Sequence, residues 1–169
     1  MKRITTSIGL IALVISTASP AWSLSPEDVV GTTWKLLSNV RQVEGSDKLV
    51  NNLGAHPNAV LVITSDHRFV FIETAEGRKP ATTTEEFAAL QRSEVAYSGL
   101  VTFLPDPNNS QGLKMINKVD IAWNEEWKGT SQTRFLSLDG NRLTINTPLI
   151  KNPITGEMAI STLVFERSK

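Results

Sequence analysis

The position of Arg134 in the sequence has the clearest chemical consequence. Arg134 lies in the alternating segment 130–138, which is followed by the turn residues Asp139-Gly140-Asn141 and by a second alternating segment, 142–148. A two-residue turn at this point places the even-numbered residues of the first segment on the apolar face of the second. We therefore predict that the guanidinium of Arg134 points into the protein. A buried guanidinium requires a partner, because an unpaired one costs several kcal/mol.

The sequence offers two kinds of partner for Arg134. The first is Glu73, which shares a strand face with two phenylalanines and would form an internal ion pair with the guanidinium. The second is a carboxylate or phosphate of a bound molecule, held by Arg134 with Gln132, Asn117 and Tyr97 nearby. The residues alone leave both alternatives open.

An apolar wall for such a site is predicted in the segment 111–123. From Leu113 onward its odd-numbered residues are apolar with the exception of Asn117, and they include Met115, Val119, Ile121 and Trp123. Residues of one parity share a strand face. We therefore expect Met115 and Trp123 to contact the ligand, and the fluorescence of Trp123 to report its binding.

No metal site, nucleotide site or catalytic triad is predicted. His56 and His67 have no carboxylate cluster at metal-ligand spacing around them. His67 lies in one turn with Ser65 and Asp66, and adjacent turn residues cannot adopt triad geometry. The chain contains no cysteine, which excludes thiolate ligands, cysteine nucleophiles and disulfides. We expect no cofactor.

The first 23 residues have the features of a secretory signal peptide. Two basic residues precede an apolar stretch at 8–15, and Ala21 and Ser23 occupy the small-residue positions before the expected cleavage site. We expect a soluble mature chain, 24–169, exported to the periplasm or secreted. No transmembrane segment is expected in it, because no apolar run approaches the roughly 20 residues of a spanning helix. Without the leader the chain is slightly acidic and has no basic cluster, which argues against nucleic acid as a partner.

The segments that position these residues are predicted to be eight strands and one helix. Runs rich in β-branched and aromatic residues, separated by turn residues, predict strands at 32–43, 59–65, 68–74, 97–104, 111–123, 130–138, 142–148 and 158–167. The segment 82–96 contains two overlapping capping boxes, Thr82 with Glu85 and Thr83 with Glu86, and predicts a helix between strands three and four. Eight antiparallel strands can close into a barrel, and a two-sheet sandwich is the structural alternative.

Alternation also assigns the faces of the first predicted strand. Its apolar residues of one parity are expected inside the barrel: Trp34, Leu36 and Val40. Its polar residues of the other parity are expected outside: Lys35, Asn39 and Arg41. A barrel of about eight strands has an interior that can hold one small ligand.

Four stretches of the chain, in order over nearly the whole mature sequence, follow a family pattern. They are GTTWKLL at 31–37, VAYSG at 95–99, WKGTSQTRFLSLDGNRLTI at 127–145 and VFER at 164–167. Together they resemble the bacterial lipocalin-like domain family of the calycin group. The chain departs from that pattern in having two residues between Gly31 and Trp34, and in having Asn117 or Lys118 where relatives often have a histidine. The resemblance implies one all-β domain over 24–169, an eight-stranded antiparallel calycin barrel that binds a small molecule.

The resemblance also implies a structural role for Trp34 and Arg167. In calycins a first-strand tryptophan packs beneath an arginine from the end of the last strand and closes one end of the barrel. Arg167 shares its strand face with Leu163 and Phe165, so it can reach Trp34 in this way. A guanidinium over an indole contributes about 0.5–2 kcal/mol. A direct ligand contact by Trp34 is the alternative.

These observations lead to one expected function and two alternatives. We expect an exported lipocalin-like protein that binds a small hydrophobic or amphipathic ligand, with an anionic head group as the sharper hypothesis. The first alternative is an isomerase or cyclase acting on a small apolar substrate, with Tyr97 or Glu73 as the acid or base. The second is a barrel filled by its own side chains that binds a protein partner through its outer face, near the helix at 84–96.

Overall fold

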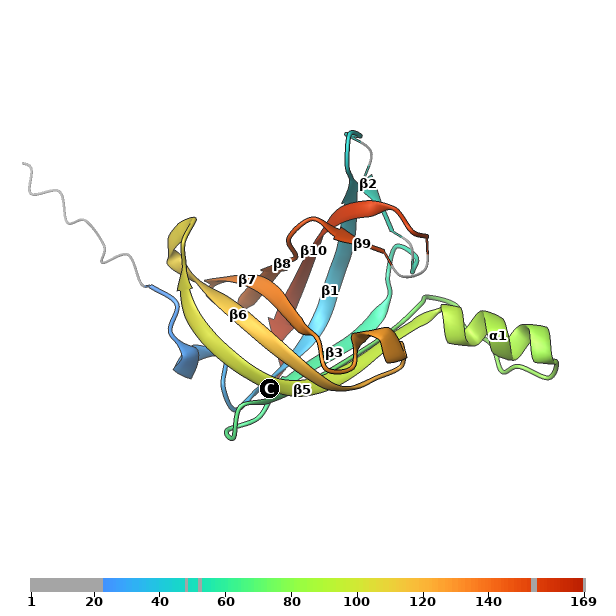
Figure 1. The fold of residues 1–169 in the computed structure, drawn as a ribbon, viewed down its shortest axis with the longest axis horizontal. Helices are drawn as coiled ribbons and strands as arrows, with labels where there is room; N and C mark the ends of the chain where they lie inside the picture. The colour runs from blue at the N-terminus through green and yellow to red at the C-terminus, as the bar shows by residue number, and fades with distance from the viewer. Residues whose placement is uncertain (1–22, 48, 52, 153–154, 169) are drawn as a thin grey trace, which may run out of the picture.

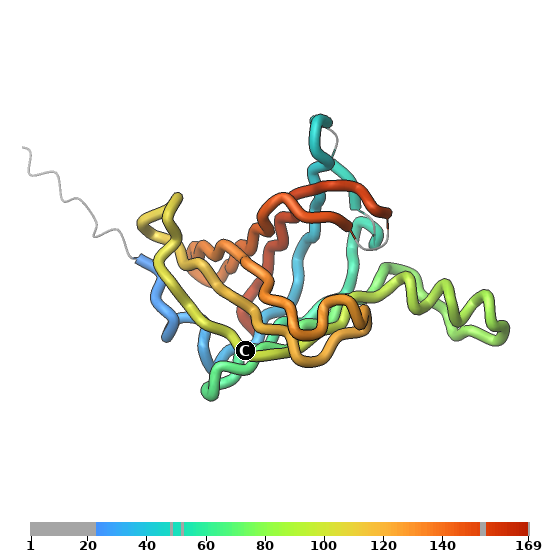
Figure 2. Tube along the Cα trace, viewed as in Figure 1, coloured from blue at the N-terminus to red at the C-terminus, as the bar shows by residue number. Residues whose placement is uncertain are grey.

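The computed structural model describes residues 23–47, 49–51, 53–152 and 155–168. Apart from Ser23, the predicted signal peptide lies outside the described residues. Figures 1 and 2 show a strongly curved sheet with one helix projecting away from it.

Eight antiparallel strands close into a barrel in the described part of the chain. They are β1 (Thr32–Val43), β3 (Asn58–Ile63), β4 (Arg68–Thr74), β5 (Glu94–Asp106), β6 (Asn109–Ala122), β7 (Ser131–Asp139), β8 (Arg142–Asn146) and β10 (Met158–Arg167). Each strand pairs with the next in this order, and β10 pairs with β1, which closes the barrel. Two short strands lie beyond this closure, β2 (Leu49–Val50) on β1 and β9 (Ile150–Lys151) on β10. The predicted eight-stranded antiparallel barrel is confirmed.

The helix α1 (Thr84–Arg92) lies between β4 and β5, which are the third and fourth strands of the barrel. Their labels are higher by one because the short strand β2, which the sequence pattern did not predict, is also numbered. Thr83 is its N-cap and forms the predicted capping box with Glu86. The helix ends earlier than predicted, because Glu94 already pairs with Thr74 of β4. None of its residues is buried, and it projects from the barrel (Figure 1).

A bulge at Leu37 changes which side of β1 faces the interior. The residues that flank Leu37 pair with consecutive residues of β10, so Leu37 has no partner of its own in that strand. Strand side chains alternate with a period of two. After one extra residue, the rest of the strand therefore faces the side opposite to the one that uninterrupted alternation predicts. The prediction for this part of β1 is therefore wrong: Asn39 and Arg41 line the interior, and Val40 takes the opposite face.

A second bulge, at Asp120, likewise changes which residues of β6 face the interior. Two consecutive residues of β5 pair with β6 residues that are two apart. The prediction that Ile121 and Trp123 continue the interior face is wrong, since Ile121 is 66% exposed and Trp123 follows the end of the strand. Gly99 of β5 makes the bulge possible, because a Cβ there would lie 2.0 Å from the carbonyl oxygen of Lys118.

Trp34 and Arg167 lie against each other at one end of the barrel. The guanidinium carbon of Arg167 is 4.6 Å from the centroid of the Trp34 ring. Trp34 is fully buried, and its indole N–H donates to the Thr32 hydroxyl at 2.6 Å. Arg167 also donates to the carbonyl oxygen of Asp28 at 2.6 Å, in the single-turn helix η1 (Pro26–Asp28). This pair therefore ties the N-terminal turn to the last strand.

Candidate functional site

The barrel encloses one main cavity in the described part of the chain. Its volume, measured over the positions that the centre of a water molecule can take, is about 110 Å³. One water needs about 10–15 Å³ in this measure, so the cavity has room for roughly ten waters. All eight barrel strands contribute to its wall, which is mostly apolar, with Leu61, Phe69, Phe71, Met115, Ile145, Leu163 and Phe165 among the lining residues. The alternative of a barrel filled by its own side chains does not fit this space.

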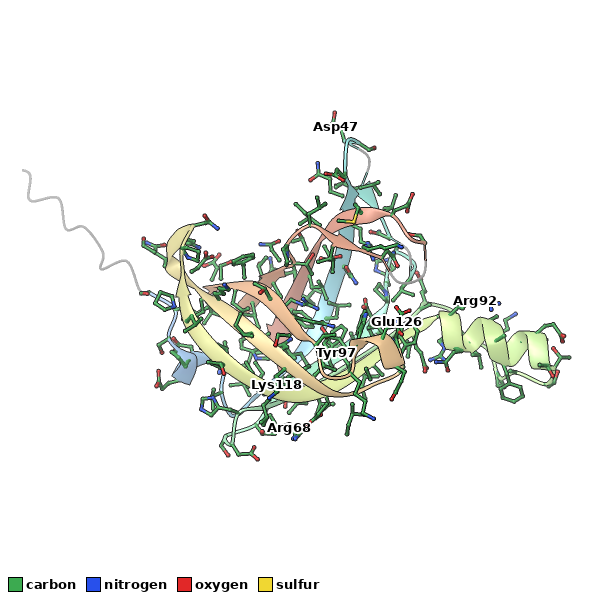
Figure 3. The ribbon with its side chains drawn as sticks, viewed as in Figure 1. Asp47, Arg68, Arg92, Tyr97, Lys118 and Glu126 are labelled. Atoms are coloured by element: carbon green, nitrogen blue, oxygen red, sulfur yellow. The ribbon has the colours of Figure 1, made fainter. Side chains whose placement is uncertain are left out.

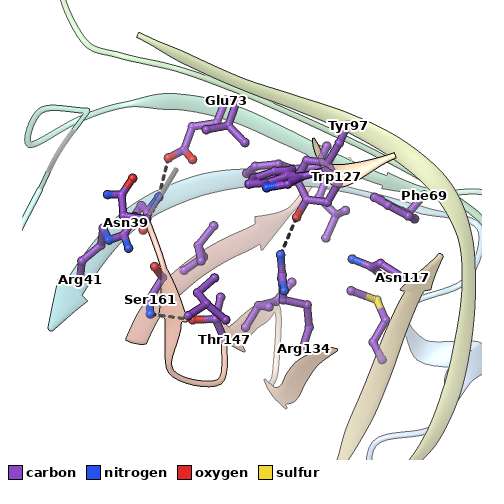
Figure 4. Close-up of a pocket in the computed structure, with 18 of the residues that line it drawn as sticks. Asn39, Arg41, Phe69, Glu73, Tyr97, Asn117, Trp127, Arg134, Thr147 and Ser161 are labelled. Carbon is purple, nitrogen blue, oxygen red and sulfur yellow. Dashed lines mark hydrogen bonds between the residues drawn. The ribbon is translucent and has the colours of Figure 1, made fainter. Parts of the chain in front are cut away.

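Arg134 points into this cavity from β7, as the hairpin pairing predicts (Figure 4). Its side chain is buried, and its hydrogen bonds among the described residues go to neutral acceptors. Nη2 donates to the hydroxyl of Tyr97 at 3.1 Å and to Oε1 of Gln132 at 2.6 Å, and Nη1 donates to the carbonyl oxygen of Thr133 at 2.7 Å. Gln132 itself is not a lining residue, so it acts on the cavity through Arg134.

Of the two partners considered for Arg134, the ion pair with Glu73 is not formed among the described residues. The salt bridges among the described residues are Arg68–Asp120, Arg78–Glu94 and Lys128–Glu125, all outside the cavity. Glu73 accepts instead a hydrogen bond from Asn39. The guanidinium of Arg134 is therefore held in place by neutral groups, and its positive charge is not neutralised by a carboxylate of the described chain.

Tyr97 is held rigidly beside Arg134 by aromatic packing. Its ring makes edge-to-face contacts with Phe69, Phe71 and Trp127, with centroids 5.3, 5.4 and 5.2 Å away. Tyr97 lies inside the barrel, whereas Arg68 and Lys118 lie on its outside (Figure 3). The fixed ring positions the hydroxyl that orients the guanidinium.

Met115 and Asn117 of β6 complete this side of the cavity. They lie directly opposite Arg134 and Gln132 in the β6–β7 register. Asn117 is only 2% exposed, and its Oδ1 has no hydrogen-bond partner among the described residues. A buried amide group without a partner is unfavourable. Asn117 is therefore available to a bound molecule.

Trp123 does not line the cavity, and Trp127 does. Trp127 belongs to the single-turn helix η2 (Glu125–Trp127), and the two indole rings are 6.1 Å apart. Alternation could not identify Trp127, because it follows the strand rather than lying in it.

Glu73, Asn39 and Arg41 form a second polar group in the same cavity (Figure 4). Asn39 donates its Nδ2 hydrogen to Oε1 of Glu73 at 2.8 Å. Burial raises the pKa of the Glu73 carboxyl, while the hydrogen bond from Asn39 and the charge of Arg41 act in the opposite direction. Burial likewise lowers the pKa of Arg41. Sequence reasoning missed Asn39 and Arg41, because the bulge at Leu37 reversed their expected side.

Two other features, a metal site and a membrane-spanning helix, are absent from the described residues. No group of three or more His, Cys, Asp or Glu side chains is arranged there to hold a metal ion. No helix in the described segments is both long and apolar enough to cross a membrane.

Comparisons with known proteins agree with this geometry. A search of curated proteins gives no significant match. The sequence profile of the lipocalin-like domain matches residues 30–168, which covers every strand of the barrel and all the cavity residues described above. A barrel of about eight strands has an interior that can hold one small ligand. The chain belongs to the lipocalin-like domain family.

Proposed function

We propose that this protein is an exported carrier that binds a small, mostly apolar molecule through an anionic head group at Arg134. The observation that carries the proposal is a buried guanidinium whose hydrogen-bond partners, in the part of the chain that the structure describes, are neutral. An anion in the cavity would neutralise this charge, and charge-assisted hydrogen bonds to arginine are strong and directional. Asn117 lies on the neighbouring strand, and its amide oxygen, which has no partner among the described residues, can accept a hydrogen bond from a donor group of the ligand.

The cavity volume limits the enclosed part of the ligand. Room for roughly ten waters corresponds to about ten non-hydrogen atoms, the size of a medium-chain fatty acid. The apolar wall between the two polar groups suits such a chain, since burying it removes apolar surface from water. Octanoic acid and 1-octanol therefore make a matched pair of probes that differ in the head group.

Replacement of Arg134 tests the proposal. Arg134→Leu should weaken octanoate binding by about 2–5 kcal/mol, the scale for breaking a buried charged contact, which is about 30-fold to several thousandfold in Kd. Binding of 1-octanol should change much less. The measurement is titration of Trp127 fluorescence in a Trp123→Phe background, because Trp127 lines the cavity.

Two controls keep this result interpretable. Arg142→Leu removes an exposed guanidinium from the neighbouring strand β8 and should leave both affinities unchanged. Arg134→Gln keeps a polar side chain in case the leucine variant does not fold. Equal losses for the acid and the alcohol would contradict an anion-binding role for Arg134.

We also propose that the chain is exported after removal of residues 1–23. Support comes from the basic, apolar and small-residue regions of this leader. Intact-mass analysis of the exported protein should give a chain that begins at Leu24, and retention of the leader would refute the proposal.

A further inference from the structure

The cavity has polar groups at two separate places. Figure 4 shows Arg134 and Tyr97 on one side of the cavity and Asn39, Arg41 and Glu73 on the other. All five residues line the same space, and most of the remaining wall is apolar. A ligand with a single polar end would leave one of these places facing a hydrocarbon chain. The cavity is therefore built for a molecule with polar atoms at both ends.

The second polar group has a free donor and a free acceptor. Asn39 Nδ2 is used by Glu73, but Asn39 Oδ1 and Arg41 Nη2 are buried and have no hydrogen-bond partner among the described residues. Buried polar atoms are normally satisfied by protein, water or ligand, so each exception calls for an explanation. A group that both accepts and donates would satisfy Arg41 and Asn39 together.

The charges around this place select against an ionic ligand group. A carboxylate of the ligand would be repelled by the negative charge of Glu73, and an ammonium group would be repelled by the positive charge of Arg41. Asn39 and Arg41 lie inside only because of the bulge at Leu37, without which the strand would turn them toward solvent. An uncharged hydroxyl meets every requirement, since it can accept from Arg41 and donate to Asn39.

We infer that Asn39, Arg41 and Glu73 form a second binding subsite, which takes a hydroxyl group at the far end of the ligand from its anionic head. This inference rests on the proposed function and narrows the ligand class from fatty acids to short hydroxy acids. Glu73 acts here as a positioning residue, because its carboxylate fixes the amide of Asn39.

The test compares plain acids with terminally hydroxylated acids of the same chain length. Octanoate and 8-hydroxyoctanoate, and decanoate and 10-hydroxydecanoate, are titrated by calorimetry into the mature protein. For at least one length the hydroxyl should improve the affinity about five- to tenfold, as expected for a net gain of one good hydrogen bond. A hydroxyl placed in an apolar environment would weaken binding instead.

Substitutions of the subsite residues test whether the gain in affinity from the ligand hydroxyl arises at this subsite. Asn39→Leu should abolish the preference for the hydroxy acid over the plain acid of the same length, and Arg41→Met should do the same if the first variant does not fold. Val40→Ala, on the opposite face of the same strand, should retain the full preference.

The outcomes separate this inference from the proposed function. If plain acids bind through Arg134 but the hydroxyl brings no gain at any length, or if Asn39→Leu and Arg41→Met both keep the gain, the second subsite is wrong and the proposed function stands. If neither plain nor hydroxylated acids bind, both are wrong.

Discussion

At the scale of single residues, the cavity is defined by two buried ionisable side chains that do not pair with each other. Arg134 donates hydrogen bonds to neutral acceptors, and Glu73 accepts a hydrogen bond from the side-chain amide of Asn39. Each charge therefore keeps much of its cost of burial. This is an arrangement that a ligand can improve, because a charge already neutralised by the protein would gain less from binding an anion.

The stability of the protein should report the ionisation of Glu73. Its folded-state pKa is raised by burial above the ordinary value of 4.5, so the folded state binds the proton more tightly than the unfolded state does. Ionisation therefore destabilises the fold, and stability falls as the pH rises from 4.5 to the raised pKa. Glu73→Gln, which can still accept from Asn39 but does not titrate, should gain stability relative to the native protein over this interval.

Urea unfolding of both proteins between pH 4 and pH 8 measures this difference. The advantage of Glu73→Gln should grow with pH and become constant above the folded-state pKa of Glu73. A difference between the two proteins that stays the same across the whole range would show that the carboxyl is not destabilised by burial.

At the scale of elements, Gly99 controls the interior face of β5 and β6. Gly99→Ala would place a Cβ 2.0 Å from the carbonyl oxygen of Lys118, so the strands must separate or the bulge must shift. We expect a loss of roughly 1–3 kcal/mol of unfolding free energy, the usual scale of overpacking. The loss is measured from the shift of the urea midpoint. Ser137→Ala on β7, which has no such close approach, should change the midpoint little.

The bulges also mark how far the sequence could predict the structure. Where the ladder is regular, hairpin pairing placed Arg134 on the correct face, and strand alternation did the same for Met115. Beyond each bulge the same rule failed, for Asn39 and Arg41 in β1 and for Ile121 in β6. Alternation assigns the face of a residue only where the strand has no bulge between that residue and a known pair. The positions of bulges depend on how the strands pair in the folded protein. Gly99 was the available signal for the second bulge, because a glycine inside a strand often marks one.

At the scale of the whole molecule, the barrel has a closed end that is separate from its binding cavity. Trp34→Ala should cost roughly 3–5 kcal/mol of unfolding free energy, because it removes a fully buried indole. Arg167→Ala should cost less, since it removes a cation–π contact worth about 0.5–2 kcal/mol together with one hydrogen bond. Neither side chain lines the cavity, so octanoate affinity should be nearly unchanged in the protein that remains folded. Loss of binding in folded Trp34→Ala would instead support a direct ligand contact.

The bulge at Leu37 has a consequence for how such barrels diverge. Loss of Leu37 would leave Ser38 directly after Leu36 in the ladder with β10, so the strand would become regular while Asn39 and Arg41 kept their side. A strand of such a barrel can therefore gain or lose one residue at a bulge without exchanging the residues of its cavity wall. An alignment of related sequences that omits the gap would compare cavity residues of one protein with surface residues of another.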